Sequence, residues 1–121
     1  MKKKRILVVD DDSMNLARTK IILSKDYDIL LAESGLGALA MLKVETVDLV
    51  LLDIDMPELN GMETFQRMKE FAAHIPVIFL TASGLEEDVV RAIELGAVNY
   101  LKKPFRPQEL LKRVEQELNK S

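Results

Sequence analysis

The sequence predicts an α/β fold in which helices cover both faces of a parallel sheet. Five short apolar runs alternate along the chain with segments of helical periodicity. Continuous apolar runs bounded by turn residues are typical of strands buried on both faces, as in parallel sheets. Alternating strands and helices favour right-handed crossovers between parallel neighbours. The 121 residues suffice for a substantial core, so we expect one domain over residues 1–121.

Each apolar run has a reason to end where it does. The first stops at three consecutive acids, and the second is a weaker strand that begins at an acid. The third ends at Asp53, after which Pro57 and Asn60-Gly61 mark a loop. The fourth has Pro76 at its entrance, where a proline removes no ladder hydrogen bond. In chain order the expected strands are Ile6–Val9, Asp28–Ala32, Val47–Asp53, Ile75–Leu80 and Val98–Leu101.

Apolar residues at every third or fourth position predict the helices between these strands. Asp12 or Ser13 can cap the first helix, and a third helix is expected from Gly61 to about Phe71. Gly96 stands where the fourth helix should stop, and Pro107 suits the first turn of the last helix. The apolar residues at helical spacing are Met14, Ala17 and Ile21; Leu36, Leu39 and Leu42; Met62, Phe65 and Met68; Leu85, Val89 and Ile93; and Leu110, Leu111, Val114 and Leu118.

The composition is that of an ordinary globular protein and excludes several classes of function. Hydrophobic residues make up 48%, and the net charge of −3 gives no reason to expect nucleic-acid binding. The chain has no cysteine, so disulfides and thiolate metal sites are excluded. No stretch resembles a signal peptide or has the length of a membrane span. We therefore expect a cytoplasmic protein with no membrane contact.

Polar residues follow the strands at the edge where a site is expected. In doubly wound sheets, ligands bind outside the carboxyl ends of the strands. Asp10 and Asp11 follow the first strand, Asp53 the third, Thr81 the fourth and Lys103 the fifth. An ionised carboxylate beside a dry core is costly unless it is paired or bound to a metal. We expect these side chains to form one site.

The charges of this set indicate a magnesium site. Asp10, Asp11 and Asp53 bring three negative charges, Lys103 returns one, and a divalent cation would neutralise the rest. Oxygen ligands suit Mg²⁺, which shares its coordination shell with phosphate oxygens. Thr81 and Lys103 suit a hydrogen-bond donor and a cation for those oxygens. A carboxylate in this setting can form an aspartyl phosphate, and the rigidly held Asp53 is the best candidate.

Five motifs together resemble the receiver domain of bacterial two-component response regulators. Each motif is weak alone, but the set covers the whole chain in the right order and is highly specific. The resemblance implies a flavodoxin-like doubly wound fold with strand order 2-1-3-4-5, as in chemotaxis-type receivers. It implies a stand-alone receiver or one cut from a larger protein. The motifs are Val8-Val9-Asp10-Asp11, Leu52-Asp53-Ile54-Asp55-Met56-Pro57, Asn60-Gly61, Leu80-Thr81-Ala82 and Lys103-Pro104-Phe105.

The resemblance also implies how the acidic residues divide their roles. Asp53 matches the phosphoacceptor of the family. Asp10 and Asp11 match the acidic pair that holds Mg²⁺, with Asp11 as a direct ligand and Asp10 acting largely through water. Asp55, two residues after the acceptor, matches the position whose backbone carbonyl reaches the metal.

Three further residues match the switch of the family. Thr81 matches the hydroxyl that moves toward the phosphoryl group, and Lys103 the lysine that pairs with it. Tyr100 matches the aromatic side chain that then turns inward, and the bond from Lys103 to Pro104 is expected to be cis. A sensor histidine kinase or histidine phosphotransfer protein donates the group, and the receiver catalyses only this transfer and its own dephosphorylation. The face of the fourth helix, fifth strand and fifth helix then signals to an unidentified downstream protein.

Two departures from the family pattern bear on this chain's behaviour. Asp55 is an acid where many receivers carry a neutral side chain, and with Ser83 it occupies a position that tunes hydrolysis of the phosphoryl group. We expect Asp55 to alter the phosphoryl lifetime. Val98-Asn99 stands where receivers of winged-helix regulators commonly carry an acidic pair that helps to hold a dimer, so that dimer is not expected here.

Three other classes of protein share parts of this pattern. Asp53-Ile54-Asp55 also resembles the nucleophile motif of haloacid-dehalogenase-type phosphatases, although that class normally starts from its first strand and needs a longer chain. Gly35 to Ala40 fits a dinucleotide-binding pattern, but the strand before it is weak and the chain is short, so a helix start with a glycine turn is the favoured interpretation. A degenerate interaction module that is not phosphorylated is the third, and the five retained site residues speak against it.

Overall fold

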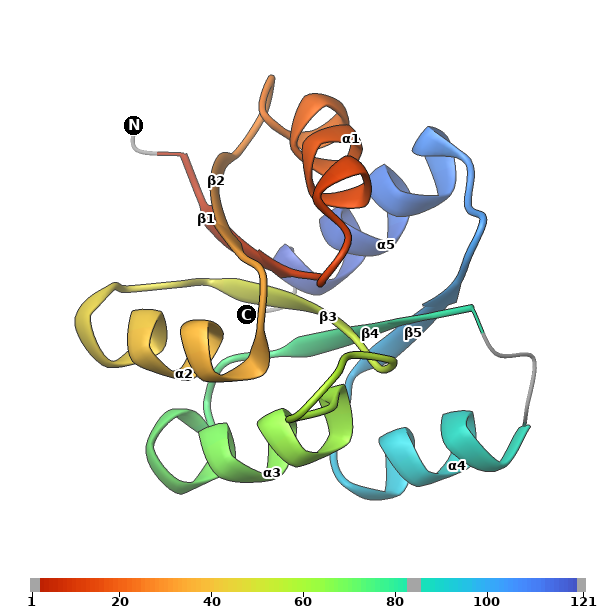
Figure 1. Cartoon of the computed structure of the whole chain (residues 1–121). Helices are drawn as coiled ribbons and strands as arrows, with labels where there is room; N and C mark the ends of the chain where they lie inside the picture. The colour runs from red at the N-terminus through yellow and green to blue at the C-terminus, as the bar shows by residue number, and fades with distance from the viewer. Residues whose placement is uncertain (1–2, 83–85, 120–121) are drawn as a thin grey trace.

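The computed structural model describes residues 3–82 and 86–119, and it has the predicted architecture. Five parallel strands form one sheet in the order β2-β1-β3-β4-β5 (Figure 1). The strands are β1 (Arg5–Val9), β2 (Asp28–Ala32), β3 (Leu49–Asp53), β4 (Val77–Thr81) and β5 (Asn99–Lys102). The helices are α1 (Ser13–Leu23), α2 (Gly35–Val44), α3 (Gly61–Ala72), α4 (Glu86–Glu94) and α5 (Pro107–Leu118).

The helices form one layer on each face of the sheet. Helices α1 and α5 cover one face, and α2, α3 and α4 cover the other (Figure 1). Successive residues of a strand point to opposite faces, so Leu7 and Val9 pack under α2 and α3 while Ile6 and Val8 pack under α1 and α5. Both faces of the central strands are therefore buried, which explains why the sequence shows continuous apolar runs. No helix among the described residues is both long and apolar enough to cross a membrane.

The helix termini follow the expected capping chemistry. The side chain of Asp12 accepts a hydrogen bond from the backbone N–H of Met14 at 2.9 Å, which confirms the predicted cap of α1. Asn60 and Glu63 form a reciprocal capping box at the start of α3. Asp12 is thereby committed to the helix, and the loop between β1 and α1 is held close to the edge of the sheet.

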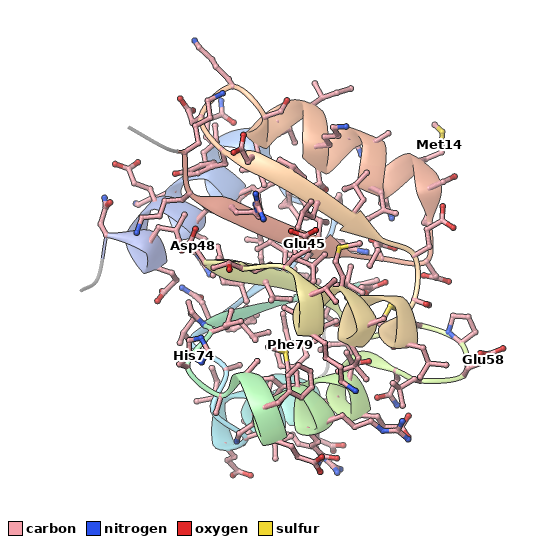
Figure 2. All side chains as sticks on the ribbon, turned by 90° about the vertical axis from the view of Figure 1, so that its left-hand side faces the viewer. Met14, Glu45, Asp48, Glu58, His74 and Phe79 are labelled. Atoms are coloured by element: carbon pink, nitrogen blue, oxygen red, sulfur yellow. The ribbon has the colours of Figure 1, made fainter. Side chains whose placement is uncertain are left out.

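Helix α1 turns a different side to the sheet than its apolar spacing suggested. Met14 and Ile21 are 78% and 77% exposed, and Figure 2 shows Met14 projecting outward from the helix. The residues that pack inward are instead Leu16, Thr19 and Leu23. An apolar stripe on α1 is therefore left on the surface, beginning next to the carboxyl edge of the sheet.

Helix α4 shows a similar difference. Ile93 is 47% exposed, whereas the neighbouring Ala92 is fully buried. Leu85 and the side chain of Val89, which share the predicted stripe with Ile93, lie outside the described residues. The stripes of the other helices face the core as expected, apart from Leu36, which is exposed at the start of α2.

Candidate functional site

The sheet order brings four strand ends to one edge. Asp53 is the last residue of β3 and Thr81 the last of β4, while Asp10 and Lys103 directly follow β1 and β5. Strands β1, β3, β4 and β5 are consecutive neighbours in the sheet, so these residues lie along one rim. The backbone N–H of Lys103 donates to the carbonyl of Thr81 at 2.7 Å, which fixes the end of β5 against β4. Four elements distant in sequence thus assemble the site.

Three carboxylates meet at this rim. One ligand oxygen from each of Asp10, Asp11 and Asp53 can be chosen so that all three lie within 4.8 Å of one another. Asp10 and Asp53 are buried, whereas Asp11 is exposed at the mouth. Asp53 Oδ1 accepts from the backbone N–H of Asp55 at 3.3 Å, and Asp10 Oδ1 accepts from that of Asp12 at 3.0 Å. The loops after β1 and β3 therefore orient the two buried acids.

One lysine serves both buried acids. Lys103 Nζ lies 2.7 Å from Asp10 Oδ2 and 3.5 Å from Asp53 Oδ2. The Lys103–Pro104 bond is cis, as predicted. The ammonium thus contacts two of the three carboxylates that could hold a metal ion.

The electrostatics show that one ammonium does not fully compensate the acids. Burial raises the pKa of Asp53 to about 6, the Lys103 charge opposes this shift, and the Asp10 charge adds to it. Burial lowers the pKa of Lys103, but its hydrogen bond to Asp10 and the charges of Asp53 and Asp10 outweigh that effect and raise it overall. The site is short of positive charge, and a further cation would favour the ionised form of Asp53.

The donor set fits Mg²⁺. The ligand atoms of the group are oxygens, two of the three carboxylates are held by backbone hydrogen bonds, and Asp11 at the mouth leaves room for water ligands. Among the described residues, this is the cluster of three acidic, histidine or cysteine side chains whose geometry could hold a metal ion. A metal there would be bound by Asp10, Asp11 and Asp53.

The predicted switch residues lie on the next two strands of the sheet after the strand that carries Asp53, Thr81 on β4 and Tyr100 on β5. Thr81 is almost fully buried at the end of β4. Tyr100 is on β5, opposite Phe79 in the register of the two strands, and its side chain is 38% exposed. Thr81 is therefore close to the rim, whereas Tyr100 is partly exposed to solvent on the edge strand β5.

Asp55 lies beside the rim on the side of α3 and α4. Its side chain is exposed and lines a cavity of about 620 Å³ that also touches Asn60, Glu63 and Arg91. Ser83, predicted to act with Asp55, lies outside the described residues. Asp55 is thus placed where its carboxylate faces solvent close to the candidate acceptor.

A second cavity opens on the opposite side of the rim and was not predicted. It has a volume of about 280 Å³ and is bounded by Asp10 and Lys103, by Asn15 and Arg18 of α1, and by Phe105. Asn15 and Arg18 are polar residues between the apolar positions Met14, Ala17 and Ile21 of α1, and no role was predicted for them from the sequence. Asn15 lies three residues before Arg18 and four before Thr19, which places the three side chains on one face of a helix. This spacing was the signal in the sequence that they could line a common cavity.

The glycine pattern at the start of α2 has a packing explanation. A Cβ at Gly35 would lie 2.2 Å from Thr64 Oγ1 and 3.0 Å from the carbonyl oxygen of Leu59. The absence of a side chain at Gly35 therefore lets α2 approach α3 and its preceding loop. No bound dinucleotide is needed to account for it.

Comparisons with known proteins agree with this geometry. The family model described as the response regulator receiver domain matches residues 6–115. The transcriptional regulatory protein CpxR of Klebsiella pneumoniae is 42% identical over 118 residues, which are 97% of this chain and 50% of that protein. The alkaline phosphatase synthesis transcriptional regulatory protein PhoP of Bacillus subtilis is 37% identical over 119 residues, 98% of this chain and 50% of that protein.

A solved structure shows the same fold. The CheY-like receiver domain protein from Methanospirillum hungatei superposes with a TM-score of 0.92 at 32% identity, covering 98% of this chain and 95% of that chain. The chain spans about half the length of the curated relatives it matches.

Proposed function

Because this chain belongs to the response regulator receiver domain family of two-component signalling, we propose that Asp53 is its phosphoacceptor. The observation that supports the proposal most directly is the grouping of Asp53 with Asp10 and Asp11 around a possible metal position, with Lys103 within 3.5 Å of the Asp53 carboxylate. A nucleophilic carboxylate, a metal-binding pair and a cation are the groups that transfer of a phosphoryl group to an acid requires.

In the proposed reaction, a carboxylate oxygen of Asp53 attacks the phosphorus of a phosphohistidine. The new Asp53 O–P bond forms as the P–N bond to the imidazole breaks, and the imidazole leaves with the electron pair. Mg²⁺, bound by Asp10, Asp11, Asp53 and the backbone carbonyl of Asp55, would neutralise charge on the phosphoryl oxygens. Lys103 turns from Asp53 toward these oxygens, and the Thr81 hydroxyl donates to another.

The proposed donor is a sensor histidine kinase or a histidine phosphotransfer protein. The surface beside the rim has the features that a protein donor needs. The exposed apolar residues Met14 and Ile21 of α1 offer contact area, and the cavity bounded by Arg18 and Phe105 leads from them toward Asp10 and Lys103. A helical donor that presents a phosphohistidine could rest on this side while the phosphoryl group reaches Asp53.

The output of the reaction is a change in the surface formed by α4, β5 and α5. A phosphoryl group adds negative charge and three acceptor oxygens at Asp53. We infer that the buried Thr81 moves toward it and that the exposed Tyr100 takes an inward position, which alters this surface for an unidentified downstream protein. Residues 1–121 would act as one cytoplasmic receiver unit that catalyses only its own phosphorylation and dephosphorylation. We expect no direct nucleic-acid binding by residues 1–121, whose net charge is −3.

A mass measurement tests the proposal. The chain is incubated with Mg²⁺ and a small acyl phosphate, and its intact mass is followed over time. We expect a gain of one phosphoryl group that requires Mg²⁺ and is absent from the Asp53→Asn variant. A gain that survives Asp53→Asn, or no gain in the parent, would overturn the assignment. The haloacid-dehalogenase alternative predicts steady turnover of a phosphomonoester, which we do not expect.

A further inference from the structure

The C-terminal end of α4 is held by a side chain from α3. Gly96 has a φ of 106° and donates to the carbonyl of Ile93, while Ala97 donates to that of Ala92, both at 3.0 Å. These two bonds form a Schellman motif, which needs a residue of positive φ and leaves the carbonyl of Leu95 unused. Lys69 Nζ donates a hydrogen bond to this Leu95 carbonyl. An ammonium here also opposes the partial negative charge of the helix end.

Lys69 is itself held in place by an aromatic side chain. Its ammonium lies 5.3 Å from the centroid of the Phe65 ring. Phe65 in turn meets Phe79 of β4 edge to face, with the centroids 5.3 Å apart. A Cβ at Gly96 would lie 3.5 Å from Lys69 Nζ and 4.0 Å from Phe65, so the helix end, the lysine and the ring are in close contact. We refer to Lys69, Phe65, Leu95 and Gly96 as the α4 clasp.

Few of the described side chains of α4 are buried. Among its described side chains, Ala92 alone is buried, while Val90 and Ile93 are 53% and 47% exposed. Burial of a single alanine contributes little compared with burial of a leucine or phenylalanine. Among the described residues, the contacts of α4 are therefore concentrated at its C-terminal end, in the clasp and Ala92.

The space between α3 and α4 is closed at the clasp and open toward the rim. The cavity of about 620 Å³ is lined by Met62, Glu63 and Gln66 of α3, by Arg91 of α4 and by Asp55. Arg91 lies one helical turn before Leu95, whose N–H donates to the Arg91 carbonyl at 3.0 Å. The hollow thus begins one turn from the clasp and extends to the candidate phosphoacceptor loop. Figure 1 shows the two helices on the same face of the sheet.

This combination is the geometry of a hinge. We propose that the α4 clasp is the fixed end of α4, and that the helix swings about Lys69 within the adjacent hollow when Asp53 is phosphorylated. The inference rests on the proposed function, and it names the pivot of the switch. Phe79 and Thr81 are alternate residues of β4 and point to the same face, so the clasp is seated on the strand that carries the proposed switch hydroxyl.

Amide hydrogen exchange followed by NMR tests this proposal on the full chain. In Lys69→Met, which keeps the aliphatic stem over Phe65 but removes the charge, we expect the amides of Leu95, Gly96 and Ala97 to exchange about tenfold faster, as loss of a charged hydrogen bond implies. Lys69→Arg should retain most of the protection. Lys43→Met is the matched control, because Lys43 lies 5.5 Å over the Phe71 ring but holds no helix end.

The second part compares the parent with and without excess acyl phosphate and Mg²⁺, with phosphorylation verified by mass. We expect exchange to change in the first half of α4 while the Leu95, Gly96 and Ala97 amides stay protected in both states. Unchanged exchange in Lys69→Met, or loss of protection at these three amides on phosphorylation, would overturn the hinge. Failure of the parent to gain a phosphoryl group would instead overturn the proposed function, and the exchange of unphosphorylated Lys69→Met would still decide whether the clasp exists.

Discussion

Lys103 is bound more closely to Asp10 than to Asp53. Its ammonium lies 2.7 Å from an Asp10 oxygen and 3.5 Å from an Asp53 oxygen. Since Asp10 belongs to the proposed metal-binding pair, the lysine and a metal ion compete for the same negative charge. The unphosphorylated site is therefore a balance between two cations, and changing one of them should shift the other.

Replacement of Lys103 by methionine should strengthen binding of Mg²⁺. The variant removes a positive charge a few ångströms from the proposed metal position, so we expect the dissociation constant at pH 8 to fall by about three- to tenfold. Without metal, the buried acids lose their cation, and the free energy of unfolding should drop by about 2–4 kcal/mol. Calorimetric metal titration and urea unfolding measure both effects. Lys102→Met, at the exposed neighbouring position, should change neither; weaker Mg²⁺ binding in Lys103→Met would contradict the competition.

Replacement of Asp53 by asparagine should stabilise the metal-free protein at neutral pH. The pKa of Asp53 is raised from 3.8 to about 6, so the folded state binds its proton more tightly than the unfolded state does. This contribution to stability is fully present below the unfolded pKa and is lost as the pH rises through about 6. At pH 7.5 the asparagine variant should therefore be more stable by about 1–3 kcal/mol.

Urea unfolding of parent and variant at pH 4 and pH 7.5, with and without Mg²⁺, separates the causes. The extra stability of Asp53→Asn over the parent should decrease toward pH 4. It should vanish or reverse with saturating Mg²⁺, because a bound metal would stabilise the ionised carboxylate of the parent. A variant that is less stable than the parent at pH 7.5 without metal would show that burial does not disfavour the charge.

The strand ends were predictable from the sequence for a physical reason. A strand buried on both faces cannot contain a charge, so an acid such as Asp53 or Asp10 marks where the strand leaves the core. The parallel alternation then places all carboxyl ends at one rim. The preference of Lys103 for Asp10 over Asp53 was not predictable, because it depends on differences of less than one ångström between side-chain positions.

The sequence also did not predict which side of helices α1 and α4 faces the sheet. Met14 and Ile21 are seven residues apart, and so are Leu16 and Leu23, so both pairs have the same helical period. Periodicity gives the spacing of a stripe but not which of two stripes faces the sheet. In α1 the leucines are buried and the other pair is exposed. A surface that binds a partner carries apolar residues of its own, and this blurs the pattern at functional helices.

Replacement of Gly61 by alanine should disturb the site through the backbone. A Cβ there would lie 2.3 Å from the carbonyl oxygen of Asp53 and 2.8 Å from Ile54 Cα, and neither is the flexible end of a side chain. Relief requires α3 or the end of β3 to move, so we expect a loss of about 2–4 kcal/mol in the free energy of unfolding and weaker Mg²⁺ binding. Gly37→Ala is the control, because its Cβ meets only Ser34 Oγ at 3.1 Å. If both variants unfold at the parent's midpoint, close approach at Gly61 is not required.

Asp55 should set the lifetime of the phosphoryl group. Its backbone N–H donates to Asp53 Oδ1 at 3.3 Å, and its exposed carboxylate lines the solvent-filled hollow beside the loop that follows the acceptor. A carboxylate at this position can accept a hydrogen bond from the attacking water. We therefore expect Asp55→Asn, which keeps the backbone contact, to slow dephosphorylation by about three- to tenfold, well below the effect of a fully buried general base. Loss of the mass of one phosphoryl group after removal of the acyl phosphate gives the rate.

Glu58→Gln is the matched control for Asp55→Asn. It removes the same charge from the same loop, but Glu58 projects into solvent away from the sheet (Figure 2). Its dephosphorylation rate should equal that of the parent. The proposed metal contact of Asp55 uses the backbone carbonyl, so the affinity of Asp55→Asn for Mg²⁺ should stay within about twofold of the parent's. Equal dephosphorylation rates in all three proteins would remove Asp55 from the reaction. A slower rate in both variants would assign the effect to the net charge of the loop.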